Sequence, residues 1–171
     1  MIEPFRGIAI RFLAWLLRAG SMRVDWWVCD PDGTVLRRGR RWNLITNAGR
    51  QQWHLQSYGT SGLASLGFCY CALSADAVTE TATSTSLSNE IASNGLSRVQ
   101  CGVSLPVSSG NQTVLTASWT ASGVGIPAPQ KGALFNASSN GVMNHVFGFS
   151  QGAVTLAAGQ SFNIRGVVTM G

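Results

Sequence analysis

Few side chains in this sequence are suited to acid–base chemistry. The 171 residues include two histidines and seven carboxylates. His145 lies in an alternating apolar stretch and His54 lies in an expected helix, so we predict structural roles for both. Glu80 and Glu90 resemble a glycosidase pair in type only, because their hydroxyl-rich flanks lack the apolar surroundings that raise the pKa of a catalytic acid. The sequence therefore predicts a protein that is not an enzyme.

The cysteines offer little material for a metal site. Cys29, Cys69, Cys71 and Cys101 form no Cys-x-x-Cys pair and have no histidine at zinc-finger spacing. Cys69 and Cys71 are two apart in a strand-like run and would share one face, where a bond between them would be strained. We expect buried free thiols, with a bond from either to Cys101 as the open alternative. The sequence also lacks the common nucleotide, hydrolase and calcium motifs, so we predict no cofactor, no metal and no small-molecule substrate.

Six tryptophans provide material for interfaces or for sugar stacking. Trp26 and Trp27 are adjacent, so a strand would direct them to opposite faces. We favour core and interface roles for the tryptophans. The alternative is glycan stacking on Trp27, Trp42 and Tyr58.

The positive charge is concentrated near the amino terminus. Residues 1–50 hold nine arginines and four acidic residues, whereas residues 51–171 hold three cations and three acidic residues. Arginine pairs bidentately with carboxylates and phosphates and tolerates interfaces. We therefore predict partner docking at the densest cluster, Arg37, Arg38, Arg40 and Arg41. A solvated basic hairpin is one alternative. Salt-dependent nucleic-acid or membrane binding by this basic arm is another, but no motif predicts specific nucleic-acid recognition.

Residues 5–19 predict an apolar helix that starts after Pro4 and ends before Gly20. Arg11 interrupts the apolar run of a secretory signal, and the segment falls short of the roughly 20 residues of a membrane span. We therefore favour a docking helix over a membrane contact. Its candidate docking residues are Ile8, Phe12, Trp15 and Leu16.

The remainder of the chain predicts mainly β structure. Asp30-Pro-Asp-Gly33 has the chemistry of a turn, so we interpret residues 22–42 as a β-hairpin and its aspartates as turn residues, not metal ligands. Residues 47–58 predict one short helix, and Ser74–Ser88 predicts a long surface loop.

Apolar and polar residues alternate over 96–105, 113–121 and 160–170, and Met143, His145, Phe147 and Phe149 share another face. This period of two is typical of half-buried antiparallel strands. We predict a jelly-roll-like antiparallel β-sandwich at residues 22–171, with its main strands at 66–171, preceded by the docking helix in an arm at residues 1–21.

Several segments appear in a recognisable order. They are a DxDG-like turn at Asp30–Gly33, the NLITNAG segment at Asn43–Gly49, Phe68–Leu73, the threonine-rich Thr79–Glu90, Gly132–Phe147 and Val154–Ser161. In this order the sequence resembles a diffuse family of small structural proteins of tailed-bacteriophage virions. The resemblance covers about residues 22–171 and does not include the helix at 5–19.

The resemblance implies a non-enzymatic β-sandwich in a tail, a collar, a fibre attachment or a capsid decoration. Such a protein assembles in the cytoplasm of the bacterial host and becomes part of the virion. Its partners would be copies of itself and other virion proteins. The low charged fraction, 11% against about 25% in average globular chains, agrees with contacts between subunits. The alternative is a glycan-binding or adhesion module of a phage particle.

Overall fold

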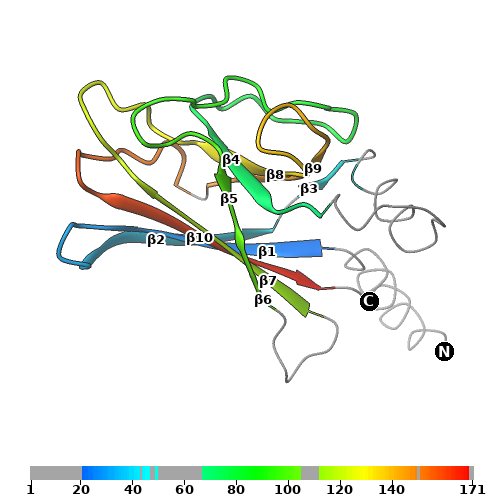
Figure 1. The fold of residues 1–171 in the computed structure, drawn as a ribbon, viewed down its shortest axis with the longest axis horizontal. Helices are drawn as coiled ribbons and strands as arrows, with labels where there is room; N and C mark the ends of the chain where they lie inside the picture. The colour runs from blue at the N-terminus through cyan, green and yellow to red at the C-terminus, as the bar shows by residue number, and fades with distance from the viewer. Residues whose placement is uncertain are drawn as a thin grey trace, which may run out of the picture.

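A computed structural model of the protein describes residues 21–42, 44–46, 49, 67–104, 112–149 and 151–169. These residues form ten β-strands in two antiparallel five-stranded sheets, seen as two layers in Figure 1. The strands are β1 (Ser21–Cys29), β2 (Val35–Trp42), β3 (Leu44–Ile45), β4 (Tyr70–Ser74), β5 (Val99–Gln100), β6 (Gly102–Ser104), β7 (Gln112–Thr120), β8 (Lys131–Phe135), β9 (Met143–Gly148) and β10 (Ser161–Thr169).

The two sheets join strands that are far apart in the sequence. The first sheet has the order β2-β1-β10-β7-β6, and the second has the order β3-β9-β8-β4-β5. The blue β1 and the red β10 lie side by side in Figure 1, paired from Ser21 with Thr169 to Cys29 with Ser161. The prediction of a mainly β, antiparallel architecture is confirmed.

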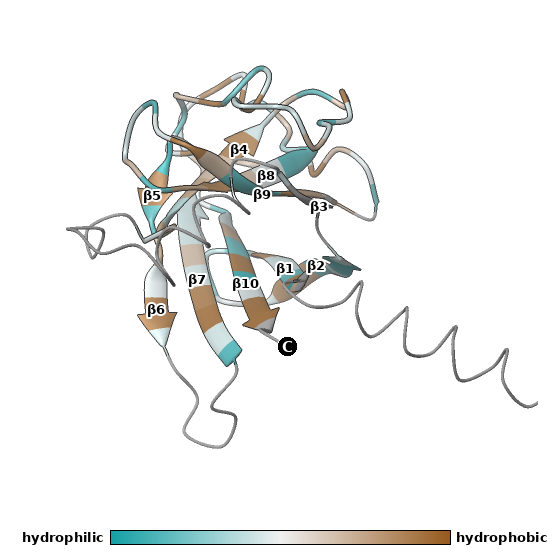
Figure 2. Ribbon diagram, turned by 90° about the vertical axis from the view of Figure 1, so that its right-hand side faces the viewer, coloured by the Kyte–Doolittle hydropathy of each residue, from teal (hydrophilic) through white to brown (hydrophobic). Residues whose placement is uncertain are grey.

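The sheets face each other across one apolar core. Trp26 in β1, Trp119 in β7 and Phe162 in β10 are buried in the same cluster as Leu73 in β4 and Phe147 in β9. Figure 2 shows hydrophobic and polar bands alternating along β10. The period of two predicted for 113–121 and 160–170 is therefore confirmed where the structure describes these residues. The facing sides of the two sheets are buried against each other, which gives a sandwich-like arrangement.

The predicted hairpin is confirmed, with β1 and β2 antiparallel on either side of the turn. The Gly33 N–H donates to the carbonyl oxygen of Asp30 at 2.9 Å, and Gly33 has a φ of +88° that suits glycine. The Thr34 N–H donates to Asp32 Oδ1 at 2.9 Å, and these contacts with Thr34 lower the pKa of Asp32. Asp32 thus has the turn role that its spacing predicts.

The single strand predicted at 96–105 is wrong. The chain forms β5 in the second sheet, changes sheets at Cys101 and continues as β6 in the first sheet. Cys101 is buried at this crossing, but Val103 is 56% exposed because β6 is the edge of its sheet. Alternation along the sequence does not reveal a strand that leaves one sheet for the other.

The prediction of a surface loop at Ser74–Ser88 is also wrong in part. Ser74 belongs to β4, and Glu80 and Leu87 are buried. The sequence predicts one buried face for β9, the face that contains His145. In the structure both faces are buried, because Asn144 and Val146 on the other face are buried as well. These segments are covered on both sides, so their polar residues need partners within the protein.

The predicted helix at 5–19, with its docking residues Ile8, Phe12, Trp15 and Leu16, lies outside the described residues. The predicted helix at 47–58 lies outside them except at Gly49.

The end of the NLITNAG segment is attached to β9. Thr46 is fully buried, its N–H donates to the Asn144 carbonyl oxygen at 2.9 Å, and its Oγ1 donates to the Met143 carbonyl oxygen at 2.6 Å. The Gly49 N–H donates back to Thr46 Oγ1 at 3.1 Å. Gly49 packs so closely that a Cβ there would lie 1.8 Å from Asn144 Oδ1. The threonine and the glycine of this segment therefore have structural roles.

We predict that Gly49→Ala destabilises the protein, because its methyl group overlaps Asn144 and the packed backbone must move. The expected loss is about 1–3 kcal/mol of unfolding free energy, measured by urea denaturation. Gly148→Ala is the matched control, since a Cβ at Gly148 meets no atom within 4 Å. The control should change stability by less than about 0.5 kcal/mol. Equal stabilities of the two variants would contradict the close packing of Gly49.

Candidate functional site

The predicted arginine cluster lies on β2, at the edge of the first sheet. Every residue of β2 except Gly39 is exposed. Arg38 pairs with Trp27 of β1, and Arg40 pairs with Asp25, so these two arginines share the outer face of the sheet. Arg37 and Arg41 alternate with them and belong to the opposite face. The edge strand thus carries cations on both faces.

One carboxylate serves several of these cations. Asp25 Oδ1 accepts a hydrogen bond from Arg40 Nε, and Asp25 Oδ2 lies 3.4 Å from Arg23 Nε and 3.9 Å from Arg165 Nη1. Arg37, Arg38 and Arg41 have no carboxylate partner among the described residues. The outer face around Asp25 therefore retains an excess of positive charge.

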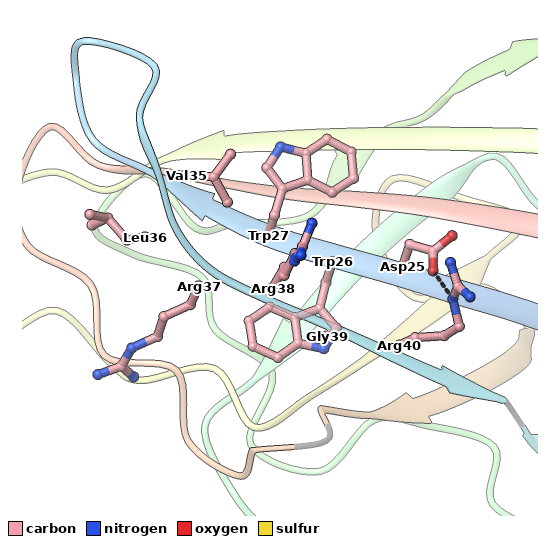
Figure 3. A pocket seen from close by; sticks show the side chains of 9 residues that line it. All are labelled: Asp25, Trp26, Trp27, Val35, Leu36, Arg37, Arg38, Gly39 and Arg40. Carbon is pink, nitrogen blue, oxygen red and sulfur yellow. Dashed lines mark hydrogen bonds and ion pairs between the residues drawn. The ribbon is translucent and has the colours of Figure 1, made fainter.

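Apolar groups accompany this charge. Val35 is 53% exposed and Leu36 is 46% exposed on the same strand. Figure 3 shows Trp27, Val35 and Arg38 on one side of the hairpin and Trp26 on the other, around an open groove of about 920 Å³. A surface that joins arginines with exposed apolar side chains and a half-buried tryptophan has the composition of a protein interface. We call the described residues Val35–Trp42 the arginine edge.

The second candidate feature is a groove at the end of β2. Trp42 is 57% exposed and lines a hollow of about 350 Å³, together with Asp76, Val78 and Gln130. Trp27 lines the other groove. The structure therefore does not gather the predicted stacking residues Trp27 and Trp42 in one groove, and Tyr58 lies outside the described residues.

A buried lysine forms one wall of the Trp42 groove. Lys131 is 5% exposed, and its Nζ lies 2.7 Å from Asp76 Oδ1 and 2.8 Å from Glu80 Oε1. The same Nζ donates to Ser88 Oγ at 2.7 Å and to the Val78 carbonyl oxygen at 2.5 Å. Four acceptors therefore surround one ammonium group and attach the 76–88 segment to β8.

The pKa values of both carboxylates reflect this lysine. The hydrogen bond from Lys131 is the largest influence on Asp76 and lowers its pKa. Burial raises the pKa of Glu80, but hydrogen bonds from Lys131 and Ser88 outweigh burial and leave that pKa below its ordinary value. Both groups are therefore charged near neutral pH and are held as structural anions.

Glu90 has a cation of its own. Arg98 donates from Nε to Glu90 Oε1 at 2.9 Å and from Nη2 to Oε2 at 2.6 Å. Its Nη1 donates to the carbonyl oxygens of Ala137 and Asn140, and its guanidinium lies 3.7 Å from the centre of the Phe135 ring. Glu80 and Glu90 therefore each pair with a different cation.

His145 has a structural position, as predicted. It is 1% exposed, and burial lowers its pKa to about 3, so the imidazole is neutral at physiological pH. All four cysteines are free thiols. Its interaction with the Cys101 thiol, together with burial, raises the pKa of Cys71. The prediction of free thiols is confirmed, although Cys29 and Cys69 are only half-buried.

Two further features are absent from the described part of the chain. No three His, Cys, Asp or Glu side chains there gather into a group that could hold a metal ion. The same residues include no helix with the length and apolar character needed to cross a bilayer.

Comparisons with protein-family models, with curated proteins and with solved structures find no match to this chain. The arginine edge and the Trp42 groove are therefore interpreted from their own geometry.

Sequence reasoning located the arginine edge but missed both buried cations. One signal was present: Lys131 is the sole lysine of the chain and directly precedes an apolar strand. Arg98 carried no comparable signal, because its partners come from two separate segments, at Glu90 and at 135–140, that only the folded chain brings together.

We predict that Lys131→Met costs about 3–5 kcal/mol of unfolding free energy at pH 7, because it leaves the buried Glu80 without its cation. Arg37→Gln on the exposed edge is the control and should change stability by less than about 0.5 kcal/mol. Urea denaturation measures both variants.

The same pair of variants predicts a pH dependence. Because the folded protein lowers the pKa values of Asp76 and Glu80, both carboxylates stabilise it at pH values above their ordinary pKa values of 3.8 and 4.5. This stabilisation disappears as the pH falls through the lowered pKa values of the folded state. In Lys131→Met, acid instead neutralises an unpaired buried carboxylate. The difference in unfolding free energy between Lys131→Met and the native sequence should therefore become smaller below about pH 4.5. A deficit that is constant with pH would contradict the assigned ion pairs.

Proposed function

We propose that this protein is a non-enzymatic structural subunit of a bacteriophage particle, in the tail, the collar, a fibre attachment or the capsid decoration. It works by assembling with copies of itself and with other virion proteins, in the cytoplasm of the bacterial host. The observation that carries the proposal is the arginine edge, an eight-residue edge strand with four arginines and exposed Val35, Leu36 and Trp42. The four arginines discourage pairing with a like-charged edge, whereas the exposed apolar side chains beside them favour contact with a partner protein.

The arrangement of the motifs adds support. Asp30–Gly33 forms the β1–β2 turn, Thr46 and Gly49 attach to β9, and Val154–Ser161 leads into β10. Three of the segments that carry the phage resemblance therefore lie at turns and strand junctions, and Phe68–Leu73 and Gly132–Phe147 include parts of β4, β8 and β9.

The finer description as a jelly roll is part of the same proposal. Its support is the nested pairing of β1 with β10, β3 with β9 and β4 with β8. In each pair a strand from the amino-terminal half of the chain lies beside a strand from the carboxy-terminal half. In double-sheet jelly rolls the chain likewise alternates between the two sheets.

We predict that the purified full-length protein is a stable oligomer by size-exclusion chromatography with light scattering. The apolar segment at 5–19 should resist proteolysis in this state, because burial against another chain would protect it. A full-length Phe12→Ser/Trp15→Ser variant should dissociate while keeping the circular dichroism of its sheets. A monodisperse monomer whose 5–19 segment is cut readily would overturn the proposal.

A second candidate is glycan binding, favoured by the exposed Trp42 ring beside the polar wall of its groove. Aromatic faces stack on sugars, and Gln130 and Asp76 supply hydrogen-bonding groups nearby. If the Trp42 groove binds a glycan, we predict that a glycan array identifies the saccharide. Trp42→Ala should then abolish the signal and Trp27→Ala should preserve it. A silent array removes this candidate.

A further inference from the structure

The arginine edge has one strand partner. In the first sheet β2 pairs with β1 and ends the strand order, so no other strand among the described residues pairs with it. Near this edge Gln151 Nε2 donates to the Arg38 carbonyl oxygen at 3.4 Å, and β2 also contacts β9 of the second sheet. Eight residues in extended form present an edge of about 27 Å, at roughly 3.4 Å per residue. This edge is long enough to accept another strand.

The charges decide the character of that strand. The arginine edge contains four arginines and no acidic residue. A strand added to a sheet directs its side chains alternately to the two faces. Arg38 and Arg40 would flank such a strand on the outer face, and Arg37 and Arg41 would flank it on the opposite face. Acidic side chains on an added strand would therefore meet arginines on whichever face they point to.

A second copy of β2 does not fit this position. Edge-to-edge pairing of two copies would set four arginines against four, and like charges across a strand pair are destabilising. The acidic residues between 67 and 104 are not available either, because Asp76 and Glu80 contact Lys131 and Glu90 contacts Arg98. Of the other acidic residues described, Asp25 contacts Arg40, and Asp30 and Asp32 belong to the β1–β2 turn. We therefore expect the acidic strand to come from a different protein.

A nucleic acid fits less well. A duplex presents its phosphates to one surface, so it would use the arginines on one face of β2 and leave the backbone edge without partners. An extended peptide uses the backbone edge and the arginines of both faces at once.

We propose that the arginine edge binds an extended acidic segment of a different protein, which adds to the first sheet as a sixth strand beside β2. This inference rests on the proposed function, since it names the chemistry of one assembly partner. Copies of this chain would meet each other through other surfaces.

The test uses the full-length protein and a fluorescently labelled eight-residue peptide that repeats Glu-Glu-Val-Val, which as a strand directs glutamates to both faces. Fluorescence anisotropy should show binding that weakens as salt is raised. The same peptide with every backbone nitrogen methylated keeps its charge but cannot donate to a strand, and it should bind at least tenfold more weakly. A peptide with glutamine in place of glutamate should also lose at least tenfold.

The variants test both faces of the edge. Arg38→Gln on the outer face and Arg41→Gln on the opposite face should each weaken peptide binding threefold or more. Arg165→Gln is the matched control, because Arg165 belongs to β10, two strands away from the edge, and it should stay within twofold of the native affinity.

Three results would overturn the inference: no peptide binding, equal binding of the methylated peptide, or tighter binding of a DNA duplex than of the peptide at equal ionic strength. Light scattering on the same samples separates the two proposals. An oligomer that binds no acidic peptide refutes the added strand and leaves the structural role standing. A monomer that binds the peptide does the reverse.

Discussion

Phe162 lies at the centre of the contact that holds the two sheets together. Its ring centre is 6.0 Å from those of Trp26 and Trp119 in the first sheet and 5.1 Å from that of Phe149, which directly follows β9 of the second. These four rings come from distant parts of the chain, so none of them is buried until β1, β7, β9 and β10 are all in place. Aromatic burial of this kind makes the fold cooperative and gives the edge strands a rigid support.

The core also determines where charge can remain. A buried cation needs partners that replace water, and Lys131 and Arg98 have them in Glu80, Glu90 and nearby carbonyl oxygens. The charges of Lys131 and Arg98 are therefore balanced by carboxylates inside the protein. The unmatched arginines gather on β2, where solvent or another protein can supply the counter-charge. For this reason we regard the arginine edge as an interaction surface and the buried ion pairs as part of the framework.

Local chemistry explains which parts of the fold were predictable. The turn at Asp30–Gly33 depends on the conformations of four adjacent residues, and the alternation along β7 and β10 depends on one buried face. These features were predicted from the sequence, as were the free thiols and the structural position of His145. The interruption at Cys101 and the burial of Glu80 were not predicted, because each depends on strands from elsewhere in the chain.

For the candidate site, the sequence by itself determined that four arginines lie close together and that alternate ones point to opposite faces of a strand. It also determined that few carboxylates exist to neutralise them. Only the tertiary structure decided that this strand is an edge, that Asp25 is shared among three arginines, and that Trp27 and Trp42 line different grooves. The physical reason is that side-chain spacing follows from the backbone geometry of neighbouring residues. Exposure of an edge depends on which distant strand occupies the adjacent position, and burial of the whole core selects that strand.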